Sequence, residues 1–178
     1  FTESPEALAA LRQAVEEAHP FTKREATLTS ATGQSLTVDY AVTPVLTRAG
    51  AEFVTPLSVS ALAGEKVHDQ LFDLTAEAEM GHIQLSRVAD LIVVAPATAD
   101  LMAKAAQGRA DDLASTLLLA TDTPVLMAPA MNVRMWGHAA TRRNLATLKA
   151  DGIAFVGPGE GPMACGEFGE GRLAEPEQ

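Results

Sequence analysis

The sequence predicts an α/β protein in which a parallel β-sheet lies between helices on both faces, a three-layer arrangement. Short apolar runs recur without polar alternation, which is typical of strands buried on both faces. Alanine-rich stretches separate these runs, and a βαβαβ order of this kind implies parallel strands. The expected strands are Leu91–Ala95, Val125–Ala128 and Ile153–Val156, and the expected helices are Ala99–Gln107, Asp111–Ala120 and Arg142–Ala150.

The first 43 residues differ in character from the rest and are expected to form an atypical N-terminal segment. A capping serine, a proline and an acid at Ser4-Pro5-Glu6 predict a helix over Ser4–Ala18. Alternating apolar residues favour strands at Glu25–Ala31 and Ser35–Val42, joined as a hairpin by a glycine-containing link. We therefore divide the chain into residues 1–43, a helix plus hairpin, and residues 44–178, the α/β domain.

Composition narrows the classes of function. The net charge of −10 argues against nucleic-acid binding, which needs clustered lysine and arginine. A single cysteine excludes an internal disulfide, and the four histidines show no close ligand spacing, so no metal is expected. No apolar run approaches the roughly 20 residues that span a bilayer. We expect a cytoplasmic protein, and a first residue other than methionine leads us to expect a fragment or processed form.

Two segments that follow predicted strands are candidates for ligand binding. Residues 95–100 end a strand and open a helix, where free backbone N–H groups can bind phosphate. Thr98 can add a hydroxyl to such a site, or Thr98 or Asp100 can simply cap the helix. Asn132 follows the next strand, and its amide can donate to a carboxylate. The alternative interpretation is a turn asparagine with Trp136 in the core.

Two further side chains are candidates for proton transfer. His82 precedes a short helical stretch, and an imidazole that titrates near pH 7 suits general acid–base work, although a lone histidine is also a common packing or surface residue. Cys165 lies in the glycine-rich stretch from Gly157 to Gln178, which is expected to be a loop or flap. A thiol in such a loop has little packing purpose, and the acids beside it favour proton donation over attack as a thiolate.

Five motifs occur in a fixed order: Met80–Ile83, Ala95–Asp100, Gly108–Leu113, Pro129–Trp136 and Ala164–Arg172. With these motifs, the chain from about Val45 to Glu175 resembles the homo-oligomeric flavin-containing cysteine decarboxylase family. Within that family it is similar to the phosphopantothenoylcysteine decarboxylase domain of bacterial bifunctional coenzyme A biosynthesis proteins.

This resemblance implies a flavodoxin/Rossmann-like fold, a homotrimer that binds FMN, and decarboxylation of 4′-phosphopantothenoylcysteine to 4′-phosphopantetheine in coenzyme A biosynthesis. It implies catalytic roles for His82, for Asn132 as the binder of the substrate carboxylate, and for Cys165 as a proton donor. It implies that Thr47 and Arg48 belong to a loop on the phosphate side of the flavin. It also implies flavin contacts for Thr98, Ala99, Asp100, Leu101 and Ala130.

The N-terminal segment departs from that family. The family begins with an apolar strand and a Gly-Gly-containing turn at the flavin phosphate, and residues 1–43 have no Gly-Gly pair. Leu101 also stands where a threonine is common. Residues 25–44 instead resemble the closing strands of a PAS sensor domain from a nitrogen-regulation histidine kinase. We hypothesise that the strand at 35–42 takes the sheet edge of the missing first strand and that the helix at 4–18 covers one face.

Three interpretations of function stand at this point. The first is an FMN-dependent carbon–carbon lyase. The second is a non-catalytic chimeric or engineered α/β module with impaired flavin binding. The third is a signalling fragment that contains part of a PAS domain. Flavin bound to the purified protein would separate the first interpretation from the other two.

Overall fold

The structure is a computed structural model that describes residues 24–29, 35–71, 82–164 and 166–175. These residues belong to two compact units, Phe1–Asp69 and Gln70–Gln178, each of which is described by itself. The helix expected at 4–18 lies outside the described residues. The expected boundary between residues 43 and 44 marks a change of family resemblance, and it stays a prediction.

The first unit contains the predicted hairpin. β1 (Arg24–Thr29) and β2 (Ser35–Tyr40) pair antiparallel, with Arg24 opposite Tyr40. Among the described residues these strands form a two-stranded sheet of their own. The ladder hydrogen bonds of β2 go to β1, and the hypothesis that residues 35–42 take the edge of the parallel sheet stays a prediction.

A short helical region follows the hairpin in the first unit. η1 (Gly50–Glu52) is a single 3-10 turn, and α2 (Pro56–Ala63) is a two-turn helix. The hydroxyl of Thr55 caps α2 by accepting a hydrogen bond from the amide of Ser58 at 3.1 Å. Gly64 ends α2 with a φ of 75°, a left-handed conformation that glycine adopts without strain.

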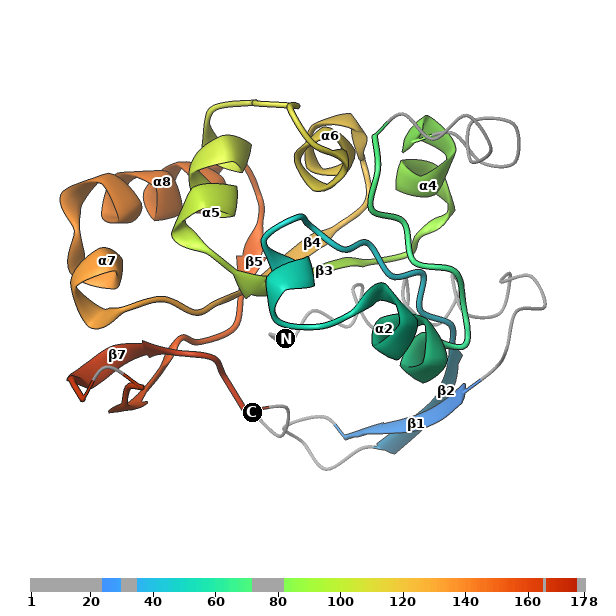
Figure 1. Ribbon diagram of the computed structural model, residues 1–178, viewed down its shortest axis with the longest axis horizontal. Helices are drawn as coiled ribbons and strands as arrows, with labels where there is room; N and C mark the ends of the chain where they lie inside the picture. Colours follow the sequence, from blue (N-terminus) through green and yellow to red (C-terminus); the bar gives the residue numbers. More distant parts are fainter. Residues whose placement is uncertain (1–23, 30–34, 72–81, 165, 176–178) are drawn as a thin grey trace. The chain divides into compact units, whose positions relative to one another are not determined.

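The second unit is built around a parallel sheet, as the sequence predicted (Figure 1). Its three strands lie side by side in chain order, and both neighbouring pairs are parallel. In chain order the elements are α4 (His82–Val88), β3 (Ile92–Ala97), α5 (Ala99–Ala106), α6 (Leu113–Ala120), β4 (Val125–Pro129), α7 (Val133–Gly137), α8 (Ala139–Ala150), β5 (Ala154–Phe155), β6 (Gly159–Pro162) and β7 (Phe168–Arg172).

Capping side chains explain where two of these helices begin. Asp112 starts α6 with a capping box, in which its carboxylate accepts from the Ser115 amide at 2.8 Å and its own amide donates to the Ser115 hydroxyl at 3.2 Å. The imidazole of His138 accepts from the amide of Ala140 at 3.2 Å. Helix α8 therefore begins at Ala139, ahead of the predicted start at Arg142.

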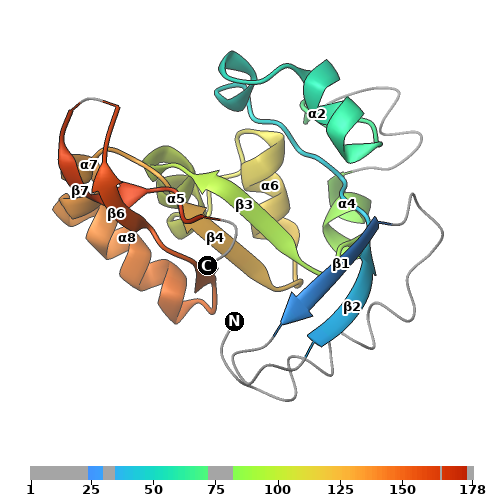
Figure 2. The same cartoon turned by 90° about the horizontal axis from the view of Figure 1, so that it is seen from below.

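The core of the second unit lies between the sheet and one layer of helices. Figures 1 and 2 show α5, α6 and α8 on the same face of β3 and β4. Met102 of α5, Met127 of β4 and Leu148 of α8 meet there and are almost fully buried. The other face of β3 is open, and Val93 is 56% exposed. The prediction that this strand is buried on both faces is therefore wrong at Val93.

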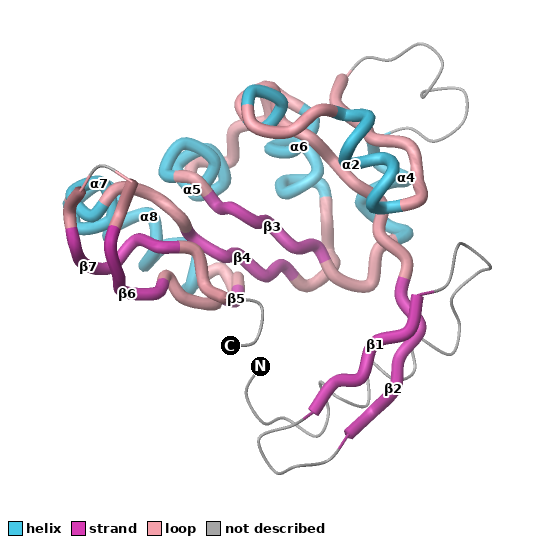
Figure 3. The backbone as a smooth tube through the Cα atoms, turned by 60° about the horizontal axis from the view of Figure 1, so that its bottom comes forward, coloured by secondary structure: helices cyan, strands magenta, loops and turns pink. Residues whose placement is uncertain are grey.

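The glycine-rich stretch after β5 contains regular structure where a loop or flap was expected. β6 and β7 pair antiparallel, with Pro162 opposite Phe168, so the two strands form a hairpin (Figure 3). Strand periodicity is absent from the sequence here, because Gly159–Pro162 and Phe168–Arg172 lack apolar alternation. Gly171 has a φ of 138°, and a β-carbon there would overlap the carbonyl oxygen of Met131.

Candidate active site

The candidate site lies where β3 and β4 end. Ala97 is in register with Pro129, and the amide of Ala130 donates to the carbonyl oxygen of Ala97 at 3.3 Å. The segments that follow the two strands, α5 after Thr98 and α7 after Asn132, therefore begin close together at the carboxyl edge of the sheet. Ligands bind at this edge in open α/β sheets.

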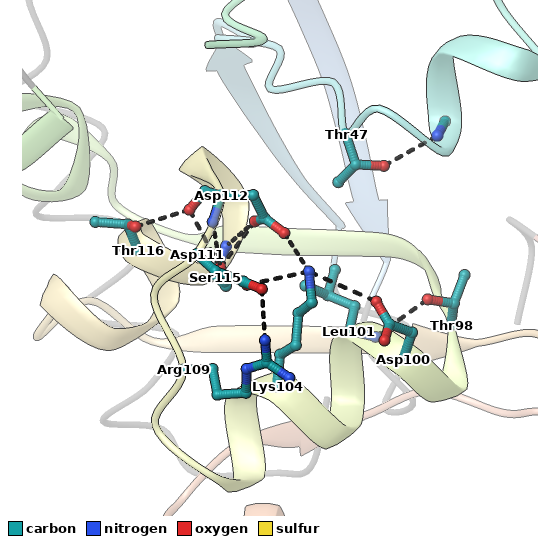
Figure 4. Close-up of polar contacts among 11 residues, drawn as sticks. Thr47, Thr98, Asp100, Leu101, Lys104, Arg109, Asp111, Asp112, Ser115 and Thr116 are labelled. Carbon is teal, nitrogen blue, oxygen red and sulfur yellow. Dashed lines mark hydrogen bonds and ion pairs between the residues drawn. The ribbon is translucent and has the colours of Figure 1, made fainter. Parts of the chain in front are cut away.

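Thr98 caps the helix that follows β3. Its hydroxyl accepts a hydrogen bond from the amide of Leu101 at 3.2 Å, as the simpler interpretation of this residue anticipated (Figure 4). The amides of Ala99 and Asp100 open α5 and have no carbonyl partner one turn earlier in the helix. The cap and a ligand contact are compatible, since Thr98 is exposed and its hydroxyl can also donate.

Lys104, in the last turn of α5, contacts one acid in the first turn of α5 and two acids directly before α6. Lys104 Nζ lies 2.6 Å from Asp112, 3.1 Å from Asp111 and 3.7 Å from Asp100, as Figure 4 shows. Hydrogen bonds to Asp112 and then Asp111 raise the pKa of Lys104 above its ordinary value, although burial opposes the rise. The cluster ties the site-facing end of α5 to α6.

Asn132 has both ends of its amide engaged. Its Oδ1 accepts from the backbone amide of Arg134 at 2.8 Å, which caps α7. Its Nδ2 donates to the carboxylate of Glu167 at 2.5 Å, and the guanidinium Nε of Arg134 donates to the other Glu167 oxygen at 2.9 Å. The residue predicted to bind a carboxylate therefore holds one that the chain itself supplies.

The hairpin of β6 and β7 is docked on the loop after β4. The amide of Met131 donates to the carbonyl oxygen of Gly171 at 2.9 Å. Beyond the paired strands, the amide of Met163 donates to the carbonyl oxygen of Glu167 at 2.8 Å. Cys165 lies between these two residues in the sequence and outside the described residues.

The remaining predicted site residues are placed as follows. Ala130 lies in the loop between β4 and α7 and is half-buried. Thr47 and Arg48 belong to the first unit, where the Thr47 hydroxyl accepts from the amide of Gly50 at 3.0 Å and Arg48 is exposed. His82 is the first residue of α4, and only its backbone is described. The predicted roles of all these residues stay predictions.

Sequence reasoning missed the polar partners that join the hairpin to α7 and α8. The sequence marks Glu167 only as an acid near the thiol, and it assigns no role to Glu170, Arg134 or Arg142. In the structure the indole N–H of Trp136 donates to Glu170 at 3.0 Å, and Arg142 lies 3.3 Å from the same oxygen. These contacts span 28 to 35 residues of sequence, so local spacing carries no signal for them.

The described ranges offer neither a membrane span nor a metal cluster. None of their helices is long and apolar enough to cross a bilayer. Within the same ranges, no three His, Cys, Asp or Glu side chains group in a way that could hold a metal ion.

Comparison with known sequences gives a family match and close relatives. The sequence pattern of the flavoprotein family matches residues 34–178. The coenzyme A biosynthesis bifunctional protein CoaBC of Vibrio vulnificus strain YJ016 is 52% identical over 134 residues, which are 75% of this chain and 33% of that protein. The chain therefore spans about a third of the length of the curated relatives it matches.

Solved structures with the same fold include two decarboxylases. A cysteine-to-serine variant of PPC decarboxylase, complexed with pantothenoylaminoethenethiol, is 32% identical with a TM-score of 0.63, and the match covers 75% of each chain. The FMN-dependent cysteine decarboxylase SpaF is 31% identical with a TM-score of 0.63, and the match covers 75% of this chain and 71% of that one. These likenesses confirm the predicted flavodoxin-like α/β class.

Proposed function

Since the chain belongs to the flavoprotein family, we propose that it is an FMN-dependent lyase that decarboxylates 4′-phosphopantothenoylcysteine to 4′-phosphopantetheine in coenzyme A biosynthesis. One observation carries the proposal furthest. The Asn132 amide binds the carboxylate of Glu167, which lies two residues after Cys165 in the sequence. A decarboxylase of a cysteine-derived substrate needs both a group that binds the carboxylate and a proton source for the carbon that loses CO2.

The carboxyl edge of the sheet fits a flavin. Ala99 and Ala130 are half-buried and have small side chains that suit contact with a flat ring, and the first-turn amides of α5 can donate to its polar edge. We propose that Thr98, Ala99, Asp100, Leu101 and Ala130 hold the cofactor in the second unit. We propose that Thr47 and Arg48 serve its phosphate, for which a hydroxyl and an exposed guanidinium are suitable groups. Bound FMN would supply the electron acceptor, and later the electron donor, that makes loss of CO2 possible.

The side chains of the protein itself orient the substrate, exclude water and transfer protons. Asn132 orients the substrate carboxylate by donation from Nδ2, since its Oδ1 is engaged by the Arg134 amide. The docked hairpin excludes water from the reacting end of the substrate. Cys165 donates a proton from Sγ to the carbon that has lost CO2, so that the sulfur-bearing carbon can be reduced, and His82 serves as a general acid–base group. The solved complex of a cysteine-to-serine PPC decarboxylase with pantothenoylaminoethenethiol supports this role for the cysteine.

The proposed function also suggests an oligomeric state and a cellular compartment. We propose a homotrimer, as the resemblance to homo-oligomeric decarboxylases implies. A thiol substrate and a chain with one cysteine both suit the reducing cytoplasm, which we propose as the compartment.

Flavin content and product formation test the proposed function. Purified protein should carry or take up one FMN per chain and show the absorbance spectrum of a flavin. It should convert 4′-phosphopantothenoylcysteine to 4′-phosphopantetheine with release of CO2. A Cys165→Ser variant should release CO2 and leave the product oxidised at the carbon next to sulfur. Colourless protein that takes up no added FMN would refute the proposal and favour the non-catalytic chimeric module. Normal 4′-phosphopantetheine formation by the Cys165→Ser variant would refute the role of the thiol.

A further inference from the structure

Two side chains at the start of α7 donate hydrogen bonds to the carboxylate of Glu167. Asn132 Nδ2 binds one oxygen and Arg134 Nε binds the other at 2.9 Å. The two donors are two residues apart, at the N-cap and in the first turn of α7, and they bind the same partner. Glu167 directly precedes β7, and its own backbone carbonyl accepts from Met163.

The donor side of this contact is fixed before any ligand arrives. The backbone amide of Arg134 occupies Oδ1 of Asn132, so the amide group of Asn132 presents Nδ2 outward. A neutral amide and a guanidinium that each hold one oxygen of the same carboxylate form a two-point carboxylate site. A ligand carboxylate can replace that of Glu167, because any carboxylate that reaches the same position can accept from both donors.

The contact lies at the rim of the site, where it can open. The Arg134 side chain is 87% exposed and the Glu167 side chain is 35% exposed. A released Glu167 can therefore enter water without an unpaired buried charge. An ion pair this exposed is weak, so a ligand carboxylate can compete for the donors.

We propose that, without substrate, the carboxylate of Glu167 occupies the position that the substrate carboxylate takes. When substrate binds, Glu167 leaves this position, and Arg134 together with Asn132 binds the substrate carboxylate. This inference rests on the proposed function. It adds Arg134 as a specificity-determining residue and gives Glu167 the role of a competitor. Because the product has lost its carboxylate, Glu167 returns to the two donors after the reaction and favours release of the product.

A pair of unreactive ligands isolates the carboxylate. 4′-Phosphopantothenoylserine carries the carboxylate without a thiol to oxidise, and 4′-phosphopantothenoylethanolamine lacks the carboxylate and is otherwise the same. Calorimetric titration of the FMN-loaded full chain with each ligand gives a ratio of the two Kd values. That ratio measures the contribution of the carboxylate alone, independently of turnover.

The Glu167→Gln variant should bind the serine ligand about fivefold more tightly than wild type, which corresponds to about 1 kcal/mol, and should bind the ethanolamine ligand unchanged. Glu167→Ala should show the same two results. This second variant is needed because the oxygen of a glutamine at 167 could still accept the hydrogen bond from Asn132 Nδ2. Arg134→Gln should lose most of the preference for the serine ligand, with or without the change at 167. Glu160→Gln and Arg143→Gln alter charged side chains of β6 and α8 and should leave both Kd values unchanged.

Three results would overturn the inference. They are equal changes for both ligands in the Glu167 variants, an unchanged preference in Arg134→Gln, and no binding of either ligand to any variant. Product formation is measured separately. The expected Kd pattern without formation of 4′-phosphopantetheine would support the inference and refute the proposed function. Normal product formation together with any of the three results above would refute the inference alone.

Discussion

The indole N–H of Trp136 donates to the carboxylate of Glu170 at 3.0 Å, and this bond joins α7 to β7. The indole is 5% exposed and belongs to the core of the second unit, while its N–H reaches the hairpin. Arg142 of α8 completes the junction, with its guanidinium 4.6 Å from the centre of the Trp136 ring and 3.3 Å from Glu170. One side chain therefore ties the core to the segment that contains Cys165.

Replacement of Trp136 by phenylalanine should release this junction. The variant loses a hydrogen bond to a charged acceptor, loses the stacked guanidinium and leaves a void beside the core. We expect the free energy of unfolding to fall by about 2 kcal/mol. Urea denaturation followed by far-UV circular dichroism measures the change, since Trp136 is the sole tryptophan and its fluorescence is removed.

Glu170→Gln is the matched control for that substitution. The glutamine keeps an acceptor for the indole and loses only the ion pair with Arg142, whose partners are 46% and 61% exposed. Exposed pairs contribute less than about 1 kcal/mol. A loss as large as that of Trp136→Phe would show that the ion pair, and not the buried indole, holds the junction.

Gly171 should tolerate no side chain. An alanine β-carbon would overlap the carbonyl oxygen of Met131, and its φ of 138° is one that other residues avoid. Gly171→Ala should therefore detach the hairpin, with a stability loss of about 1–3 kcal/mol and faster proteolysis within residues 159–172. Gly137→Ala is the control, because a β-carbon at that position would meet nothing within 4 Å. Equal protease resistance of the two variants would contradict the expected strain.

The sequence was informative where structure is local. The apolar runs and the alanine-rich segments predicted β3, β4, α5 and α6 to within a few residues, because strand and helix periodicity are properties of neighbouring residues. Thr98 and Asn132 were recognised as cap or turn residues for the same reason. Their polar side chains stand at the points where a strand ends and a helix begins.

The rest depended on contacts between distant parts of the chain. The exposed face of β3 at Val93 follows from which helices cover the sheet, and an apolar run alone does not specify this. The hairpin of β6 and β7 has glycine, proline and glutamate where strands usually have β-branched residues. Glu167 could be recognised as a partner of Asn132 only once the hairpin was seen to fold back over 35 residues.

The cluster around Lys104 predicts how stability depends on pH. The hydrogen bond from Lys104 lowers the pKa of Asp111. Burial acts against the lowering of the pKa of Asp112, and hydrogen bonds from Lys104 and Ser115 outweigh it. A carboxyl with a lowered folded-state pKa stabilises the protein above its unfolded pKa of about 3.9, and this contribution is lost as the pH falls through the folded value. The raised pKa of Lys104 keeps the lysine charged across this whole window.

Lys104→Met should therefore destabilise the protein at neutral pH and matter little in acid. At pH 7 three carboxylates lose their shared cation, and we expect the melting temperature to fall by roughly 2–4 °C. The difference between wild type and variant should shrink below about pH 4 as the carboxyls become protonated. Lys149→Met on α8 is the control, because no described carboxylate lies within ion-pair distance of it. A difference that stays constant from pH 7 to pH 3 would contradict the ion-pair origin.

Thr98 separates the two interpretations of the segment after β3. If its hydroxyl only caps α5, Thr98→Ala should lower stability by about 1 kcal/mol and leave FMN affinity unchanged. If the hydroxyl also contacts FMN, as we propose, the Kd for FMN should rise about fivefold as well. Fluorescence titration of FMN into the apoprotein measures the Kd, and urea denaturation of the same apoprotein measures the stability. Thr98→Ser should retain both properties, and Thr55→Ala, which removes the equivalent cap of α2, should lose stability alone. An unchanged FMN Kd in Thr98→Ala would leave Thr98 as a helix cap and remove it from the flavin site.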